Sequence, residues 1–560
     1  MTPFHAGELA IQERVGVRDQ MAGAAPYIRD FMPEQHRQFY AQLPFFFLGA
    51  LDGAGQPWAT MLAAAPGFVS SPDERTLHFN GGVLAGDPLE GQLHAGGHIG
   101  GLGLEPTTRR RNRVNGEIVS AGEDGLRVAV TQSFGNCPQY IQHRLHSDVS
   151  VEGRKVQVVR GVALTAADRE LIARADTFFI ASANMAPDAG RGRGVDVSHR
   201  GGRPGFVRVD DEYTLTSPEF VGNFFFNTQG NLALYPRAGL LFIDFERGDM
   251  LHIAVEAEII WDGPQLQAFA GAERLLRFHV REVVRNVAAL PLRWTAPQPA
   301  MQIARTGSWN EADRAQSAAG LTERWRQFTV TDVVRESGDV RSFYLEPADG
   351  LGVAPHAPGQ FVMLRVPEWA TGGAASQVRS YTISDAADGR RYRISVKRDG
   401  LVSGWLHAHL APGALIELMG PGGDFIFEEG TQRPAVFLSA GIGITPMVAM
   451  LNSLLVNGSR TRHKHPIHFI HGAREVVHAF AVHVQQLAAG HSNLLVHVQA
   501  KRIDVARLRE LLPVGDCDVY VCGPAGFMED MYQALRKLGV PDQRIRFESF
   551  GPASLQRPLT

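Results

Sequence analysis

Four short motifs in the second half of the chain combine residue types that serve redox chemistry. They read VRSYTISDA (378–386), ISVKRDGLVSGWLH (394–407), SAGIGITPM (439–447) and VCGPAGFM (521–528), in this order. In the first motif, one residue separates Arg379 from Tyr381, so the two share one face of a strand. There a guanidinium can bind a phosphate and a phenol ring can stack on a flat heterocycle, with the Thr382 hydroxyl beside them.

The later motifs join glycine-rich turns to helix starts. Ser403 stands at the beginning of the expected helix GWLHAHL, where backbone N–H groups attract phosphate. Gly441 and Gly443 follow the apolar strand AVFLSA and let the backbone approach a dinucleotide, and Pro446 suits a first helical turn. Cys522 follows the strand DVYV and is placed to lie along a nicotinamide ring. Together the four motifs predict hydride transfer from a nicotinamide to a bound flavin.

Residues 326–554 resemble the ferredoxin–NADP reductase superfamily, in the branch that holds the reductases of flavohaemoglobins and oxygenases. The resemblance rests on R-x-Y-[ST], G-x-G-x-T-P and C-G-P and covers about two fifths of the chain. It implies an antiparallel FAD-binding β-barrel (326–430) and an α/β parallel-sheet domain for NAD(P)H (431–554), with 555–560 as a tail. Alternating strands before Pro434 and strand–turn–helix repeats after it favour the same two folds.

This resemblance also implies a set of site residues. Those expected to bind FAD are Arg379, Ser380, Tyr381, Thr382, Val396, Lys397, Val402 and Ser403. Those expected to bind NAD(P)H are Gly441, Gly443, Thr445, Pro446, Cys522, Gly523 and Pro524. Hydride transfer is assigned to Tyr381, Thr382, Cys522 and Phe550, because the segment 547–550 is placed to cover the flavin ring.

The sequence departs from that family at two places. The segment NLLVHVQAKRIDVARL is shorter than in relatives, which alters the expected contacts to the nucleotide ribose. In addition, no cysteine follows Cys522, so we expect no plant-type ferredoxin domain to carry electrons onward.

The first 290 residues are rich in short strands and carry signs of an internal duplication. After a charged helical lead-in (1–40), DTFFIASAN (176–184) parallels PFFFLGALD (44–52), and RGGRPGFVRV (200–209) parallels AGQPWATML. A skeleton of Gly-[Asp/Asn], a helix-like spacer, G-x-L-x-x-x-P, a strand and Glu-Ile relates 222–259 to 86–118. These parallels predict two copies of one barrel, over 1–165 and 166–290. We also expect an amphipathic helix over 263–290 and a linker over 291–325.

This N-terminal half resembles the pyridoxamine 5′-phosphate oxidase-like, FMN-binding split-barrel superfamily. The resemblance rests on FHAGELAIQERVG, RPGFVRV, GNFFFNTQGNLALYPRAGLLFIDF and SFGNCPQYIQ. It implies tandem split β-barrels (α+β) with FMN at an interface between the two copies. The implied FMN-site positions are Arg203, Gly205, Phe206, Asn223, Thr228 and Asn231, with Arg203 as the phosphate partner. The first copy has GGHIGGLGLEP in place of NTQGNLALYP, so we expect it to be a structural half.

Composition narrows the range of partners. The 560 residues carry a net charge of −3, so no global positive field attracts nucleic acid. Three cysteines and no apolar leader predict a protein of the reducing cytoplasm, with no membrane span and no metal site. The basic run Arg109–Arg111 with Arg113 is an exception. It fits either a solvated surface strand or a contact with phosphate or an acidic partner.

Three functional readings are consistent with these patterns. In the first, electrons pass from NAD(P)H to FAD and then to FMN or a substrate in the N-terminal half. In the second, the chain is a reductase component for a separate protein acceptor, and the N-terminal half is a docking module. In the third, the N-terminal half binds haem. The sequence leaves open the final acceptor, the oligomeric state and the choice of NADH or NADPH, since Arg474 suits either a 2′-phosphate or a strand-end cap.

Overall fold

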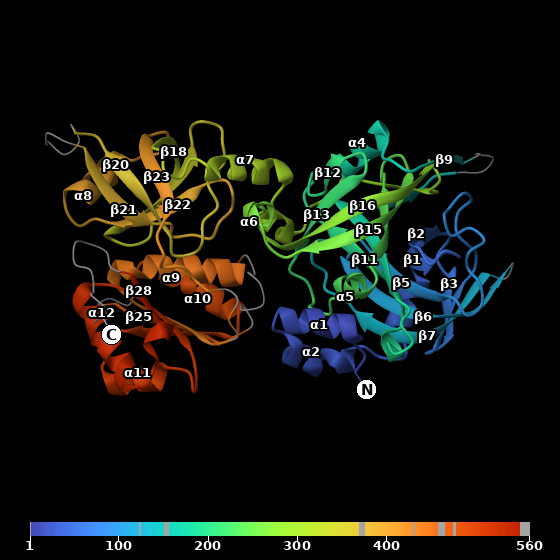
Figure 1. The fold of residues 1–560 in the computed structure, drawn as a ribbon, viewed down its shortest axis with the longest axis horizontal. Coiled ribbons are helices and arrows are strands. Elements are labelled where there is room, and N and C mark those ends of the chain that lie inside the picture. Colours follow the sequence, from blue (N-terminus) through green and yellow to red (C-terminus); the bar gives the residue numbers. More distant parts are fainter. Residues whose placement is uncertain are drawn as a thin grey trace. The chain divides into compact units, whose positions relative to one another are not determined.

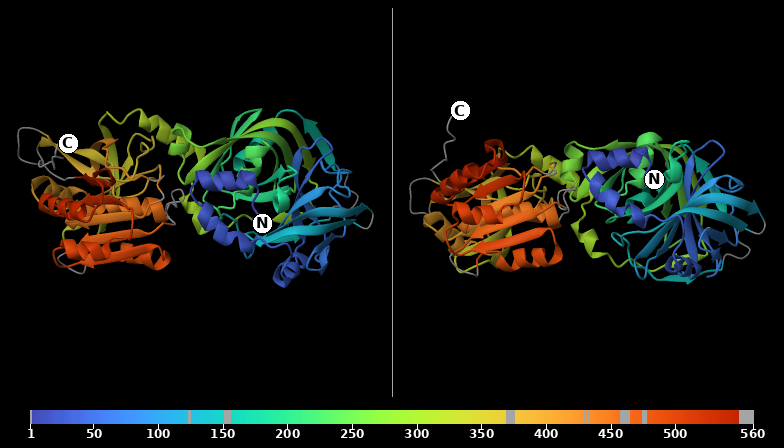
Figure 2. Two further views of the ribbon diagram at one scale, coloured as in Figure 1. Left: turned by 60° about the horizontal axis from the view of Figure 1, so that its bottom comes forward. Right: turned by 90° about the horizontal axis from the view of Figure 1, so that it is seen from below.

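The structure is a computed structural model that describes residues 2–122, 125–150, 156–368, 376–428, 431, 433–456, 465–473 and 478–548. The chain divides into two compact units (Figures 1 and 2). Unit 1 holds residues 1–266 and 272–309, and unit 2 holds residues 267–271 and 310–560.

Unit 1 begins with helices and continues into a first antiparallel sheet. The helices are α1 (Ala6–Arg14), α2 (Arg18–Ala24) and α3 (Glu34–Ala41). The strands are β1 (Phe45–Leu51), β2 (Pro57–Ala63), β3 (Val69–Asp73), β4 (Thr76–Phe79), β5 (His98–Glu105), β6 (Arg110–Gly122) and β7 (Gly125–Gly135). Their order in the sheet is β2-β1-β5-β6-β7-β4-β3. We call this sheet and its helices the first half.

A second sheet in unit 1 repeats this order. Its strands are β10 (Thr177–Asn184), β11 (Gly194–Gly201), β12 (Arg208–Asp211), β13 (Thr214–Phe220), β14 (Arg237–Ile243), β15 (Met250–Ile260) and β16 (Ala272–Val287). They run β11-β10-β14-β15-β16-β13-β12. This is the strand order of the first sheet, with β10 in the place of β1, β11 in the place of β2, and so on to β16 in the place of β7. Helices α4 (Ala166–Arg174), α5 (Asn227–Leu234) and α6 (Pro264–Ala268) accompany it. Strand β9 (Gln157–Gly161) pairs with β16, whereas β8 (His146–Asp148) and β17 (Leu292–Trp294) form a separate two-stranded sheet. This sheet and its helices form the second half, and the shared order is what a duplication predicts.

Equivalent residues of the two halves meet at their interface. Phe47 of β1 and Phe179 of β10 stand at matching positions, and their rings stack with centroids 3.6 Å apart. Gly100 of β5 and Gly239 of β14 match as well, since each pairs with the residue two places after the stacked phenylalanine. A Cβ on Gly100 would lie 2.5 Å from a backbone oxygen of β11, and one on Gly239 would lie 2.3 Å from a backbone oxygen of β2. The halves therefore pack about a local two-fold relation that needs both glycines.

The residue-level alignment of the copies differs from the sequence-based one. In the second half the G-x-L-x-x-x-P pattern falls on α5 and its end, whereas in the first half it falls on strand β5. The counterpart of β2 is β11 (Gly194–Gly201), while the sequence alignment placed it at 200–209. The predicted skeleton therefore joined residues that are not structurally equivalent, although the repetition itself is present.

The helix predicted over 263–290 is wrong, and the expected linker over 291–325 is partly ordered. The expected helix over 263–290 is the short helix α6 followed by strand β16. A bulge where β16 pairs with β15 leaves Arg281 without an opposite residue, so Val280 and Val283 both face inward. That three-residue spacing imitates a helix. The expected linker contains the ordered helix α7 (Trp309–Ala319), whose buried face consists of Trp309 and small alanines.

Unit 2 begins with a six-stranded antiparallel sheet. Its strands are β18 (Arg326–Arg335), β19 (Val340–Pro347), β20 (Phe361–Val366), β21 (Gln377–Thr382), β22 (Tyr392–Lys397) and β23 (Leu415–Gly422). They run β21-β20-β23-β18-β19-β22, and a bridge between Ile383 and Ile394 joins the two ends of this order. The sheet is therefore closed into a barrel around an apolar core, with α8 (Leu401–His409) packed against it.

A parallel α/β domain completes unit 2. The strands are β24 (Ala435–Ala440), β25 (Ile467–Gly472), β26 (Leu494–Gln499), β27 (Asp518–Cys522) and β28 (Ile545–Glu548), in the order β26-β25-β24-β27-β28. Helices α9 (Ile444–Leu451), α10 (Ala481–Gly490), α11 (Val505–Leu511) and α12 (Ala525–Lys537) alternate with them. The strand order reverses direction at β24, so the crevice for a ligand is expected where β24 and β27 end.

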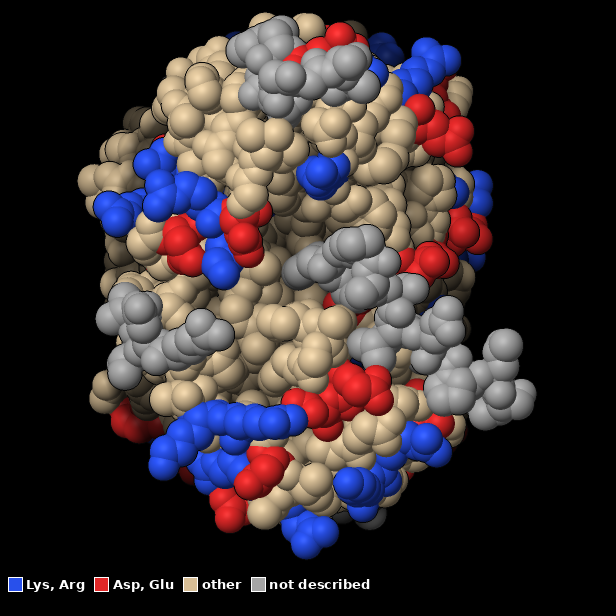
Figure 3. Space-filling model, turned by 90° about the vertical axis from the view of Figure 1, so that its left-hand side faces the viewer, with Lys and Arg blue, Asp and Glu red and all other residues tan. Residues whose placement is uncertain are grey.

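Charged groups on the face shown in Figure 3 are mixed, with Lys and Arg lying among Asp and Glu. A broad field of positive charge is the pattern that attracts nucleic acid, and the described residues on this face do not form one. In the part of the chain that the structure describes, none of the helices combines the length and the apolar character that crossing a bilayer requires.

Candidate functional site

The predicted FAD residues meet in one cavity of about 320 Å³ in unit 2. This volume lies in the range of ligand pockets. Its lining includes Arg379, Ser380, Tyr381, Thr382, Val396, Lys397, Val402 and Ser403, together with Thr445 from the predicted nucleotide set. Residues that sequence reasoning did not name also line it, namely Gln377, Ser395, Asp399, Gly400, Leu401 and Ile442. Gln377 directly precedes the first motif, and the other five lie within the predicted motifs.

Neighbouring strands set the chemistry of this cavity. Arg379 on β21 is exposed, and its Nη1 donates to the carbonyl of Val378 at 2.8 Å, which leaves other guanidinium N–H groups for a phosphate. Burial raises the pKa of Tyr381 to about 12, so the phenol is neutral at physiological pH. Thr382 is buried at the end of the same strand and lines the cavity.

The start of α8 forms the second wall. Gly400 has a φ of 104°, a conformation that favours glycine, and it turns the chain from β22 into the helix. The Ser403 Oγ accepts a hydrogen bond from the Asp399 backbone N–H at 2.8 Å and lies in the first helical turn. Backbone N–H groups at this helix start supply positive partial charge to the cavity.

The two predicted nucleotide motifs come together at the switch in strand order. A Cβ on Gly443 would lie 2.3 Å from the carbonyl oxygen of Cys522, so the turn after β24 rests directly on the end of β27. The Cys522 thiol points into the apolar core of the domain with no exposed surface, and burial raises its pKa well above the usual value. Cys522 thus offers its backbone to this crevice, and its role in hydride transfer stays a prediction. Phe550 and Arg474 lie outside the described residues.

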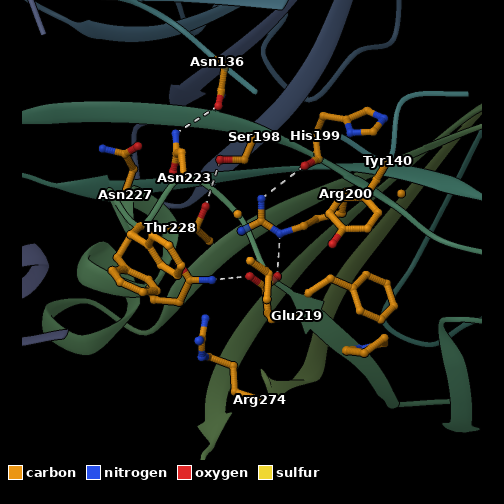
Figure 4. A pocket seen from close by; sticks show the side chains of 18 of the residues that line it. Asn136, Tyr140, Ser198, His199, Arg200, Glu219, Asn223, Asn227, Thr228 and Arg274 are labelled. Carbon is orange, nitrogen blue, oxygen red and sulfur yellow. Dashed lines mark hydrogen bonds and ion pairs between the residues drawn. The ribbon is translucent and has the colours of Figure 1, made fainter. Parts of the chain in front are cut away.

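A second candidate site lies in unit 1, between the two halves (Figure 4). Four arginines and a single carboxylate, Glu219, are among its lining residues. The arginines are Arg111, Arg113, Arg200 and Arg274. Strand β6 of the first half and strands β11, β13 and β16 of the second half supply these groups, so neither half forms the pocket alone. We call it the arginine pocket.

Only part of the predicted FMN set reaches the arginine pocket. Phe206, Asn223 and Thr228 line it. Arg203 and Gly205 lie in the turn between β11 and β12 and do not line it, so the prediction of Arg203 as the phosphate partner does not fit this pocket. Asn231 is fully buried behind the pocket wall.

The basic run on β6 alternates between two environments. Arg110 packs over the Phe39 ring at 4.3 Å and donates to the Gln35 carbonyl at 3.0 Å. Arg111 and Arg113 point to the opposite face, into the arginine pocket, where each has a buried Nε without a hydrogen-bond partner. Burial, with mutual repulsion, lowers the pKa of Arg111 to about 9, and burial lowers that of Arg113 to about 10. Both remain charged at neutral pH, so these two side chains are not part of a solvated surface strand.

Hydrogen bonds hold the other wall in place (Figure 4). Arg200 bonds to Glu219 and donates to the His199 carbonyl at 3.2 Å, and Gln229 also bonds to Glu219. Ser198 and Thr228 hydroxyls lie 2.9 Å apart, next to the Arg113 guanidinium, which bonds to Ser198. The pocket therefore presents fixed cationic and hydroxyl groups of the kind that bind an oxyanion.

A buried polar network supports the pocket from behind. Asp196 accepts from Asn115 at 2.8 Å and from Asn231 at 2.9 Å, and it lies 3.4 Å from Arg113. Glu8, on α1, accepts from Asn227 of the pocket wall and is itself buried. Burial and the nearby Asp196 raise the pKa of Glu8 to about 8. Asn231 thus positions Asp196, which in turn orients Arg113.

Comparison with known proteins concerns unit 2. Residues 327–427 match the family model of the oxidoreductase FAD-binding domain, and residues 437–533 match that of the oxidoreductase NAD-binding domain. A flavohemoprotein of Burkholderia sp. (strain TH2) is 41% identical over 256 residues, which are 43% of this chain and 62% of that protein. A flavohemoprotein of Chromobacterium violaceum is 40% identical over 264 residues, which are 42% of this chain and 63% of that protein.

A solved structure is similar over the same share of the chain. The flavohem-like FAD/NAD-binding domain of nitric oxide dioxygenase from Vibrio cholerae is 36% identical, covers 40% of this chain and 99% of its own, and has a TM-score of 0.37. The chain spans about three fifths of the length of the curated relatives it matches. The two matched domains make the protein an NAD(P)H-dependent flavoprotein oxidoreductase.

Proposed function

We propose that the chain passes electrons from NAD(P)H through FAD in unit 2 to an acceptor held in the arginine pocket of unit 1, and that this acceptor is FMN. The observation that carries the proposal is the arginine pocket, which gathers four arginines from both halves around a space that fits an oxyanion. FAD, when bound, supplies the hydride acceptor and the donor of the onward electrons.

The residues of unit 2 have separate tasks in this scheme. Arg379 binds a phosphate of FAD, and the start of α8 around Ser403 adds backbone N–H donors. Tyr381 would offer a neutral phenol to the ring system, and Thr382 would offer a hydroxyl to it. Gly443 lets the nucleotide turn rest on the end of β27, so that the nicotinamide binds where β24 and β27 end.

In unit 1 the fit to FMN rests on its phosphate. A phosphate dianion would offer acceptors to the guanidinium groups of Arg111, Arg113 and Arg200, and it would offset the repulsion among them. The enclosed space is about 100 Å³, so it suits the phosphate end of a mononucleotide, and the ring has to lie at the mouth. Resemblance to FMN-binding split barrels supports the same ligand.

Two alternatives give different outcomes in the same experiment. If the chain served a separate protein acceptor, unit 1 would need no pocket for an anion. A haem acceptor is suggested by the relatives named flavohemoprotein. However, the described part of unit 1 consists mainly of two β-sheets, whereas globins pack eight helices around haem.

The test begins with extraction of flavins from the purified full chain after incubation with FAD and FMN. We expect FAD and FMN in near-equal amounts, and two sequential phases of flavin reduction after rapid mixing with NAD(P)H. A single phase with FAD alone would exclude FMN as the acceptor. Titration with haem in parallel should give no Soret band; a stoichiometric band would favour the haem alternative.

A further inference from the structure

The local two-fold relation in unit 1 creates two equivalent positions between the halves, and only one is the arginine pocket. Arg113 of β6 lies opposite Leu102 of β5, and His252 of β15 lies opposite Leu241 of β14. Leu102 and Leu241 are themselves equivalent, because they pair with Phe47 and Phe179. His252 therefore occupies in the second half the position that Arg113 occupies in the first.

The pocket-forming side chains are replaced at this counterpart position. By the same strand registers, Arg111 corresponds to Met250, Arg113 to His252, His199 to Met61 and Arg200 to Leu62. Arg111, Arg113 and Arg200 thus have no arginine counterpart. Two of the four replacements are methionines that belong to the apolar core. Of the hydroxyl groups that meet Arg113, Ser198 is matched by Thr60.

The counterpart position is closed by contacts within the protein. The Thr60 hydroxyl donates to Asp87, whose other oxygen accepts from the Leu89 backbone N–H at 2.9 Å. His252 donates from Nδ1 to the Ala59 carbonyl at 2.9 Å and lies 3.8 Å from Asp87. Thr60 and His252 have no exposed surface, and Asp87 is 2% exposed. The chain itself thus supplies the carboxylate that would otherwise come from a ligand.

We propose that unit 1 binds a single anionic ligand per chain, in the arginine pocket, and that duplication has converted the equivalent site around His252 into a closed structural contact. This inference rests on the proposed function for the identity of the ligand as a phosphate monoester. It goes further in assigning a stoichiometry and a separate role to each site. In the open site the charges of Arg113 and Arg200 repel that of the buried Arg111, whereas at the closed site the Thr60 hydroxyl and the His252 Nδ1 are both hydrogen-bonded within the protein.

The first test is calorimetric titration of the full chain, preloaded with FAD, with FMN and separately with inorganic phosphate. We expect one FMN per chain, and loss of at least about tenfold in affinity for both probes in Arg113→Met. Arg200→Met, on the opposite wall, should weaken both probes in the same way. Arg110→Ala is the matched control, because it removes one charge from the same strand on the opposite face.

The second test separates the two sites. Thr60→Val keeps the side-chain shape but removes the hydroxyl that bonds to Asp87. It should lower the melting temperature by about 2–4 °C and leave FMN affinity within about twofold. Every variant should keep NAD(P)H-dependent reduction of FAD, which shows that unit 2 is intact.

Several outcomes would overturn the inference. Two ligands per chain would mean that the counterpart site is open, while the proposed electron path would survive. Weak binding in Thr60→Val with full binding in Arg113→Met would exchange the roles of the two sites. If neither FMN nor inorganic phosphate bound, the arginine pocket would not be an anion site. The number of phases of flavin reduction, measured independently, would then decide the proposed function.

Discussion

Arg111 Nη1 lies 3.1 Å from His199 Nδ1, and this contact fixes the tautomer of the histidine. A guanidinium only donates, so Nδ1 accepts and the ring proton sits on Nε2. That Nε2 is buried and has no hydrogen-bond partner, and His199 lines both the arginine pocket and a smaller aromatic pocket beside it. Burial and the charges of Arg111, Arg200 and Arg144 lower the pKa of His199 well below its usual value. His199 is therefore a buried neutral ring that keeps one unused N–H donor.

We predict that His199 stays neutral, with its proton on Nε2, from pH 5.5 to pH 8. Long-range ¹⁵N–¹H correlation spectra of the full chain should show this tautomer, with His199→Asn used to assign the signal. Arg111→Met removes both the donor and a repelling charge, so the pKa of His199 should rise in that variant. Arg110→Ala, which changes the same charge on the other face, should leave the signal unchanged. A His199 that titrates near pH 6.5 in the native chain would contradict the assignment.

Glu8 makes the stability of unit 1 depend on pH. Its pKa is raised to about 8 by burial and by Asp196, against 4.5 in the unfolded chain. Between these values the folded state holds a proton that the unfolded state has released. The Glu8 contribution is therefore complete below pH 4.5 and is lost as pH rises toward 8, by about 1.4 kcal/mol of unfolding free energy per pH unit.

The variant Glu8→Gln isolates this effect, because the amide resembles the protonated carboxyl in shape and charge. Relative to the native chain, its unfolding free energy should improve steadily from pH 5 to pH 8 in denaturant titrations. Glu13→Gln, which changes an exposed carboxylate at the end of the same helix, is the matched control. A flat difference for Glu8→Gln would mean that Glu8 is ionised in the folded state.

The sequence was most informative where function depends on local structure. Arg379 and Tyr381 alternate along one strand, so their spacing alone places them on the same face, and both line the cavity. The arginine pocket is different, since Arg113 and Ser198 meet only because two distant strands pack across the interface between the halves. The alternate spacing of Arg111 and Arg113 on a strand was a usable signal for a buried basic face, but nothing local identified the opposite wall.

The fold shows the same division between local and distant causes. Strand–turn–helix repeats in unit 2 follow from apolar runs and glycine turns that act over a few residues. In contrast, the β16 bulge at Arg281 shifts the inward positions by one and gives Val280 and Val283 a helical spacing. Pairing with β15 decides the conformation there, and the single-strand pattern does not contain that information.

Arg379→Ala should lower the FAD content of the purified protein. Loss of a charge-assisted phosphate contact is expected to weaken FAD binding about 10- to 100-fold, measured by fluorescence titration of the apoprotein. Arg365→Ala is the control, since Arg365 lies on the neighbouring strand and is held by Glu417 at 2.7 Å. Full retention of FAD in Arg379→Ala would remove Arg379 from the binding site.

Gly443→Ala tests the contact between the two nucleotide motifs. The added Cβ would lie 2.3 Å from the Cys522 carbonyl oxygen, so the turn after β24 has to move away from the end of β27. Because displacement by about 1 Å can slow a reaction about 100-fold, we expect stopped-flow reduction of FAD by NAD(P)H to slow by at least about tenfold. FAD content should not change, since Gly443 does not line the FAD cavity.

The matched control is Gly526→Ala, in the first turn of α12 with open space around it, and this variant should reduce FAD at the native rate. A native rate in Gly443→Ala would show that hydride transfer does not depend on this contact, and the nicotinamide would then have to bind elsewhere in unit 2.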